Sequence, residues 1–168
     1  METIVIKGLS VGALEHKVAW LVALEDIRRV IALYAKAGDD NNNPTAMAAL
    51  LAEDAQWTCA GFGAFSGRDT IARELARVGR ERILWSLHYP VAPIIDLSED
   101  LTTAHAFWWL WELTTMRDED GHEADNWLGA TYDCYFARAA DGWKIKRLTL
   151  DIKKIVPYAP ATLQEQQP

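Results

Sequence analysis

Apolar side chains recur with the period of a helix in the first forty residues, and charged side chains occupy the other faces. The recurring positions are Trp20, Leu24, Ile27, Ile31 and Tyr34. Their spacings of four and three predict an amphipathic helix over about residues 14–37. The helix runs into the turn sequence GDDNNNP, where Gly38 is expected at the position just after the helix end.

Shorter elements follow this helix. Asn43 is expected to cap a second helix that has Pro44 at its first position. Residues 52–67, AEDAQWTCAGFGAFSG, predict two short strands joined at glycine, and residues 67–79, GRDTIARELARVG, predict a third helix.

The second half of the chain predicts four long strands, at about residues 83–97, 102–117, 123–138 and 142–156. Their separators LSED, RDEDG and AADG are three hairpin signals in succession. Helices followed by a meander of antiparallel strands predict an α+β fold, with the helices packed on one face of a curved sheet. We expect one domain over residues 1–168 with a core at about 14–156.

The predicted strand 102–117 is apolar on both faces. One face carries Phe107, Trp109, Trp111 and Leu113, and the other carries Ala106, Trp108, Leu110 and Glu112. A sheet with one face in water alternates apolar and polar residues, so both faces here need cover. We expect one face to meet the helices and a pocket, and the face with Trp109 and Trp111 to meet a second subunit in a homodimer or homotrimer. The alternative is a thick core with no partner.

Composition narrows the classes of partner. Half of the residues are hydrophobic and the formal net charge is −7, which argues against disorder, nucleic-acid binding and an anionic membrane surface. No stretch reaches 18 apolar residues, and residues 1–17 make a poor signal peptide. Cys59 and Cys134 lack metal-ligand spacing, so they are expected to be buried thiols of a cytoplasmic protein.

Glu112 is the unusual residue of the strand HAFWWLWELTT. An unpaired carboxylate in an apolar environment costs several kcal/mol or shifts its pKa. Glu112 is therefore either a solvated edge residue or a functional carboxylate in the wall of a pocket.

The order of several motifs resembles the SnoaL-like branch of the NTF2-like superfamily. The matching pieces are LEDIRRVIALYAKAGDD, AMAALLAEDAQW, FGAFSGRDTIARELARV, LHYPVAP and DGWKIKR, which together span about residues 22–150. The resemblance implies a cone of helices wrapped by a strongly bent sheet, with a deep apolar pocket. This superfamily includes dehydratases, a dehydrochlorinase, steroid isomerases, polyketide cyclases, formaldehyde-eliminating lyases and non-catalytic members, so the site residues must decide the function.

The resemblance also implies roles for four residues. Tyr34 and Asp39 match the tyrosine and aspartate of acid–base members such as the bile-acid dehydratase, and Asp39 matches the catalytic aspartate of the dehydrochlorinase. His88 matches the histidine that pairs with this aspartate. Glu112 falls where the bile-acid dehydratase has a further aspartate, one methylene shorter. A neutral imidazole can abstract a proton while the carboxylate on its other nitrogen fixes the tautomer.

The walls of the pocket are expected to include four tryptophans and an asparagine, namely Trp57, Trp85, Trp108, Trp127 and Asn126. Such walls suit a small, largely apolar aromatic or polycyclic substrate. The resemblance implies no metal and no organic cofactor, and the scattered histidines indicate no metal site. We therefore expect a cofactor-independent lyase or isomerase. The alternative is a non-catalytic ligand-binding or assembly domain of the same fold.

Overall fold

A computed structural model describes residues 10–158. The first nine residues of the segment judged a poor signal peptide lie outside this range. The helices are α1 (Val11–Asp39), α2 (Pro44–Leu50) and α3 (Arg68–Glu81). The strands are β1 (Leu51–Cys59), β2 (Gly63–Ser66), β3 (Ile83–Leu97), β4 (Thr103–Arg117), β5 (Glu123–Ala139) and β6 (Gly142–Pro157). The predicted elements and the α+β class are confirmed. No helix in this range is long and apolar enough to cross a membrane.

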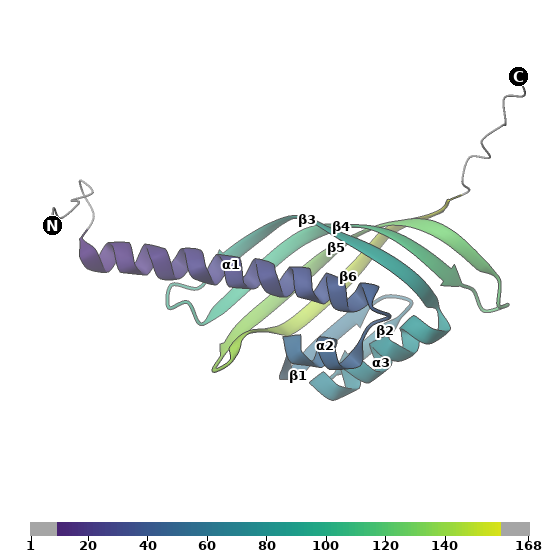
Figure 1. The fold of residues 1–168 in the computed structure, drawn as a ribbon, viewed down its shortest axis with the longest axis horizontal. Helices are drawn as coiled ribbons and strands as arrows, with labels where there is room; N and C mark the ends of the chain where they lie inside the picture. Colours follow the sequence, from purple (N-terminus) through teal and green to yellow (C-terminus); the bar gives the residue numbers. More distant parts are fainter. Residues whose placement is uncertain (1–9, 159–168) are drawn as a thin grey trace, which may run out of the picture.

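The six strands form one curved sheet in the order β2-β1-β6-β5-β4-β3. Consecutive long strands pair antiparallel through hairpins, and only the pairing of β1 with β6 is parallel. Figure 1 shows the three helices gathered on the concave side of the sheet, while the convex side has no helix over it. The sheet therefore has an inner face that meets the helices and an outer face that does not.

The core lies between α1 and the inner face of the sheet. Ile27, Ile31 and Tyr34 of α1 are buried together with Trp108 and Leu128 of the sheet. These helix positions recur at spacings of four and three, so they share one face of the helix. The alternation of β4 is strict: its even-numbered residues from Ala104 to Thr114 are buried and face the helices. The odd-numbered residues face outward.

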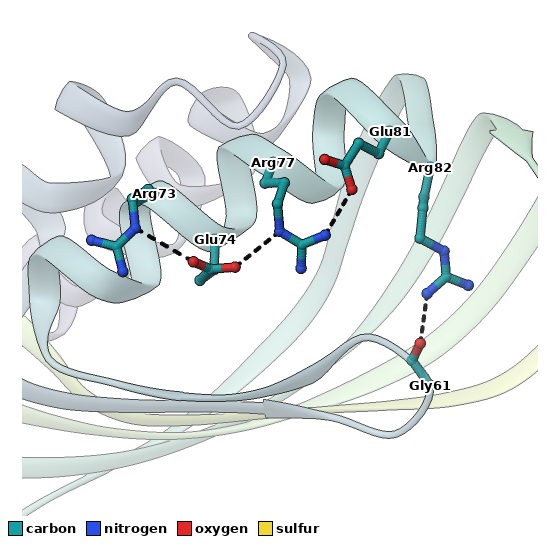
Figure 2. Close-up of polar contacts among 6 residues, drawn as sticks. All are labelled: Gly61, Arg73, Glu74, Arg77, Glu81 and Arg82. Atoms are coloured by element: carbon teal, nitrogen blue, oxygen red, sulfur yellow. Dashed lines mark hydrogen bonds and ion pairs between the residues drawn. The ribbon is translucent and has the colours of Figure 1, made fainter.

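Side-chain hydrogen bonds fix the start of α2 and hold the β1–β2 turn. The side chain of Asn43 accepts hydrogen bonds from the backbone of Thr45 and Ala46, which caps α2 as predicted. Immediately after α3, the side chain of Arg82 donates to the carbonyl of Gly61 at 2.7 Å and thereby holds the β1–β2 turn (Figure 2).

The exposed face of α3 carries a chain of ion pairs through Arg73, Glu74, Arg77 and Glu81 (Figure 2). Exposed pairs of this kind contribute little stability. Arg82 matters more for the site, because the turn that it holds carries Phe62.

Two features of α1 differ from the prediction. The helix begins at Val11, because Ser10 accepts a hydrogen bond from the backbone of Ala13 and caps it three residues earlier than the apolar pattern starts. Gly38 lies inside the helix, which continues to Asp39. The expectation that Gly38 follows the helix end is therefore wrong. Its small size has another reason, which lies in the site.

Candidate active site

A cavity opens between the inner face of the sheet and helices α1 and α3. The space between its wall atoms, together with the open solvent at its mouth, is about 560 Å³. Most of its wall is apolar, and the wall includes Trp57 and Phe62. The polar side chains that reach it are those of Tyr34, Asn42, Ser86, His88, Glu112 and Tyr132. A mostly apolar cavity with a few convergent polar groups is the usual form of a small-molecule site.

His88 is held by Asp39, the last residue of α1. Nδ1 of the imidazole lies 2.7 Å from Oδ1 of Asp39, and the backbone N–H of His88 donates to the same oxygen at 2.9 Å. Asp39 faces the outer clefts beside α1 and is not part of the cavity wall. The carboxylate therefore stands behind the imidazole and leaves Nε2 for the cavity. This arrangement favours the tautomer that has its proton on Nδ1.

Gly38 gives the imidazole its space. A methyl group at this position would come within 3.0 Å of Cε1 of His88. That distance is tighter than most contacts of a Cβ atom, so the imidazole would have to shift by a few tenths of an ångström to accommodate a methyl group here. Gly38 is thus a positioning residue of the site, and its place immediately before Asp39 is the sequence signal that could have identified it.

A register shift in the β3–β4 hairpin places Glu112 opposite His88. Near the turn, Leu97 pairs with Ala104 and Ile94 with Phe107, but beyond an irregularity at residues 91–94 the register changes by one residue. Ala92 in this irregularity has a φ of 47°. Without the shift, Leu113 would stand opposite His88. One extra residue in a strand redirects every side chain beyond it.

Glu112 is buried and incompletely hydrogen-bonded. The residue is only 3% exposed, Oε2 lies 3.6 Å from Nε2 of His88, and Oε1 has no hydrogen-bond partner within the described residues. Burial raises the pKa of this carboxyl group, the charge of His88 lowers it and the charge of Asp39 raises it, with a net rise. The alternative of a solvated edge residue is therefore wrong.

The pKa of His88 is also raised. Burial alone would lower it, but the hydrogen bond that the imidazole donates to Asp39 and the negative charges of Glu112 and Asp39 outweigh that effect. One imidazole thus stands between two carboxyl groups. Because the groups are this close, they titrate as a coupled unit.

Two tyrosines line the cavity near these groups. Nε1 of Trp57 donates to the hydroxyl oxygen of Tyr34 at 2.9 Å, which leaves the hydroxyl proton of Tyr34 available to a ligand. Tyr132 packs edge-on against Tyr34. Burial raises the pKa of both phenols well above its usual value, so both remain hydrogen-bond donors at neutral pH.

Only part of the expected wall is present. Trp57 lines the cavity. Trp85 is half exposed on the outer face of β3, and Trp127 is on the outer face of β5, where it packs against Trp111. The expectation that Trp85 and Trp127 face inward is wrong, because Trp85 is an odd number of residues from His88 and Trp127 adjoins the inward Asn126.

Trp108 and Asn126 face inward but lie outside the cavity wall. Trp108 stacks on Tyr132 with ring centroids 4.9 Å apart, so it supports a wall residue from behind. The side chain of Asn126 donates to the carbonyl of Ala124 at 2.8 Å. Neither side chain is placed to contact a ligand in this structure.

Other candidate groups lie away from the cavity. His105 pairs with Asp133 on the outer face at 2.9 Å, and Cys59 and Cys134 are buried free thiols, as expected. Within residues 10–158, the one set of three side chains close enough to share a metal ion is Asp118, Asp120 and His122. These three are exposed on the β4–β5 turn and do not line the cavity.

Several solved structures share this fold. A candidate scytalone dehydratase from Novosphingobium aromaticivorans is 24% identical, with a TM-score of 0.70 over 83% of this chain and 89% of that one. A type 2 hexachlorocyclohexane dehydrochlorinase is 20% identical, with a TM-score of 0.71 over 86% and 93%. A candidate aromatic ring hydroxylase from N. aromaticivorans is 22% identical, with a TM-score of 0.67 over 80% and 94%.

At these identities the structural likeness establishes the fold alone. No functionally curated protein matches the chain by sequence. The SnoaL-like domain family matches residues 21–149, a range that holds α1 from Leu21 onward and every residue of the polar cluster around His88. The chain therefore belongs to the SnoaL-like domain family, within the NTF2-like superfamily.

Proposed function

We propose that the cavity performs cofactor-independent acid–base chemistry on a small, largely apolar molecule that contains a ring. The reaction would be an elimination, such as a dehydration, or a related isomerisation. The observation that carries this proposal is the imidazole of His88, held at 2.7 Å by Asp39 and placed 3.6 Å from Glu112 inside an apolar cavity. Two titratable groups with different environments supply a base and an acid at one site.

His88 is the proposed base. Nε2 of the neutral ring accepts a proton from a carbon of the substrate, and the electron pair of that C–H bond forms the new double bond. Asp39 is a positioning residue, because its carboxylate accepts from Nδ1–H and stabilises the imidazolium that forms. A positioned base of this kind contributes about 10²–10⁴-fold to the rate.

Glu112 is the proposed acid. Its raised pKa favours the protonated form relative to an exposed glutamate, and in that form it donates a proton to a departing hydroxyl group, which leaves as water. The proton on Nε2 of His88 then passes to the Glu112 carboxylate, which restores both groups. Tyr34 assists by donating a hydrogen bond to the leaving group. In an isomerisation the protonated group would return its proton to another carbon of the substrate.

The substrate class is inferred from the walls. The aromatic rings of Trp57 and Phe62 and the aliphatic side chains around them suit a flat apolar molecule, and the phenols can bind one or two oxygen atoms. Among the matched structures are a dehydrochlorinase and a candidate scytalone dehydratase, which is consistent with chemistry on small ring compounds.

A probe that needs only a base tests the proposal without the natural substrate. Removal of one proton from 5-nitrobenzisoxazole breaks its N–O bond and releases a coloured phenolate. We expect the wild-type protein to open this probe faster than free imidazole at the same concentration, and His88→Gln to lower the rate at least about 100-fold.

The matched control for this test is His122→Gln. This residue also faces an aspartate through Nδ1, at 3.3 Å from Asp118, but on an exposed turn, so its loss should leave the rate unchanged. A wild-type rate no higher than that of imidazole would refute the proposal and favour a non-catalytic ligand-binding domain. An unchanged rate in His88→Gln would refute the assignment of the base.

A further inference from the structure

Two polar side chains in the cavity wall have no hydrogen-bond partner within residues 10–158. They are the hydroxyl of Ser86 and the amide of Asn42. The phenol of Tyr34 and the imidazole of His88, by contrast, are each held by a neighbouring side chain. Ser86 is only 6% exposed. Buried polar groups are almost always hydrogen-bonded, so an unpaired hydroxyl in a cavity wall indicates a partner that comes from a molecule in the cavity.

The strand geometry turns Ser86 toward the cavity and leaves its hydroxyl free. Ser86 precedes His88 by two residues on β3, so both side chains are on the inner face, about 6.5 Å apart along the strand. Thr114 stands directly opposite Ser86 on β4, but its hydroxyl donates to the backbone carbonyl of Trp85 at 3.1 Å. The polar side chain opposite Ser86 is therefore engaged elsewhere.

Asn42 is held at the cavity by the turn that follows α1. Its backbone N–H donates to the carbonyl of Gly38 at 3.0 Å, and its φ of 51° is left-handed, a conformation that asparagine adopts more readily than most residues. On the other side of the turn, Gly79 of α3 gives the amide room, because a methyl group there would lie 3.1 Å from Nδ2 of Asn42. The backbone of the turn thus positions the amide at the cavity.

Along α1, the base lies between the phenol of Tyr34 and the amide of Asn42. Tyr34 precedes Gly38 by one helical turn, which is about 6 Å along the axis. Gly38 borders the imidazole of His88. Asn42 follows Gly38 by four further residues. A molecule that reacts at His88 therefore has Tyr34 toward one end and Asn42 toward the other.

Ser86 lies at the Asn42 end. Strand β3 runs back along α1, because Pro90, two residues after His88, borders an outer groove together with Ile31 of α1. Residues before His88 on β3 therefore lie toward the end of α1 and the turn that follows it. The hydroxyl and the amide thus border the same part of the cavity, called the distal subsite below.

We infer that the distal subsite holds a neutral oxygen substituent of the substrate, at the end opposite the group that departs near Tyr34. This inference rests on the proposed function, because it names the substrate class of the same cavity. A hydroxyl and an amide together offer donors and acceptors, which suits a hydroxyl or carbonyl group. No lysine or arginine of the described range lines the cavity, and Glu112 is acidic, so a carboxylate is disfavoured. The substrate is a ring compound with oxygen at both ends.

Isothermal titration calorimetry with three naphthalenes tests the distal subsite. We expect the wild-type protein to bind 2,6-dihydroxynaphthalene at least about fivefold more tightly than 2-naphthol, because the second hydroxyl group pairs with Ser86 and Asn42. The carboxylate 6-hydroxy-2-naphthoate should bind no more tightly than 2-naphthol. Ser86→Ala, and independently Asn42→Ala, should remove the preference for the diol and leave the affinity for 2-naphthol unchanged.

The chain offers a matched control for each substitution. Asn41→Ala changes the adjacent residue of the same turn, which has the same left-handed backbone with a φ of 52° but is exposed and does not line the cavity. Ser66→Ala changes an exposed serine of β2. Both controls should keep the preference for the diol. Near-ultraviolet circular dichroism of each variant reports whether its fold is intact.

Three results would overturn the inference. The first is a wild-type protein that binds the diol no more tightly than 2-naphthol, or binds neither. The second is a preference for the diol that either folded variant, Ser86→Ala or Asn42→Ala, retains. The third is tighter binding of the carboxylate than of the diol. Because calorimetry measures binding without turnover, a protein that opens the benzisoxazole probe but shows no preference for the diol keeps the proposed function and loses only this inference.

Discussion

Replacing Glu112 with glutamine removes a carboxyl group from a buried position in the cavity and preserves the shape of the side chain. Glu112 is 3% exposed and its Oε1 has no hydrogen-bond partner among the described residues. Burial is the largest cause of its raised pKa. We therefore expect Glu112→Gln to be more stable than the wild type at pH 8, while its rate of proton-transfer catalysis on a substrate with a poor leaving group falls.

The sign and size of this stability change follow from the linkage between folding and proton binding. A carboxyl group whose pKa is raised on folding holds its proton more tightly in the folded state. The wild type therefore loses stability as the pH rises from the ordinary pKa of glutamate to the raised pKa of the folded state. Each pKa unit corresponds to about 1.36 kcal/mol, and only the cost of burying the charge is removed, because the amide of glutamine is also polar. The attraction between Glu112 and the imidazolium of His88 offsets part of this cost. We expect a net gain of about 1–2 kcal/mol at pH 8, or about 2–8 °C in Tm.

Urea unfolding at two pH values measures the effect. At about pH 3 and below, Glu112 is protonated in both the folded and unfolded states, so the gain of the variant should vanish. Glu119→Gln, on the exposed β4–β5 turn, is the control and should show no difference at either pH. A Glu112→Gln variant that is less stable than the wild type at pH 8 would show that the carboxylate stabilises the fold through His88, which contradicts the reasoning.

Three further substitutions test the geometry around the base. Gly38→Ala should lower the rate of probe opening at least tenfold, because the added methyl group displaces the ring of His88. Stability should change little, since alanine favours the helix by up to about 1 kcal/mol. An unchanged rate would show that the ring does not need this space. Asp39→Asn should lower the pKa of His88, which NMR titration of the ring proton on Cε1 measures; an unchanged or higher pKa would contradict the role of the carboxylate. Arg82→Met should raise KM more than it lowers kcat, because Arg82 holds the turn that carries Phe62 and its guanidinium lies 4.5 Å from that ring. A fall in kcat with KM unchanged would place Arg82 in the chemistry instead.

Local signals in the sequence were sufficient to predict the elements. The three hairpin signals gave the four long strands nearly to the residue, and Asn43 with Pro44 gave the start of α2, because these residue types are restricted to particular backbone conformations. The start of α1 was predicted too late. Its first turns are exposed, and the first buried residue of the helix is Ala23, so the buried apolar pattern gives no signal for the cap at Ser10.

The site was predicted less completely, for a physical reason. Strand alternation alone would have excluded Trp85 and Trp127 from the cavity, but the pairing of Glu112 with His88 depends on the irregularity at residues 91–94, which no periodic pattern reveals. Ser86 could have been found, because it precedes His88 by two residues on the same face. Phe62 could not, because it reaches the cavity from a turn whose path is set by a contact with α3.

The pH dependence of kcat/KM for opening of 5-nitrobenzisoxazole tests the central claim, that His88 is the base in this cavity, most directly. For the wild type the account predicts a rate that rises with pH to a plateau, with an apparent pKa above the usual 6.5 of imidazole, because only the neutral ring accepts a proton. Glu112→Gln should shift the profile to lower pH, since the negative charge that raises the pKa of His88 is removed. His88→Gln should lose the plateau. A His88→Gln protein that kept the wild-type rate and profile would contradict the account.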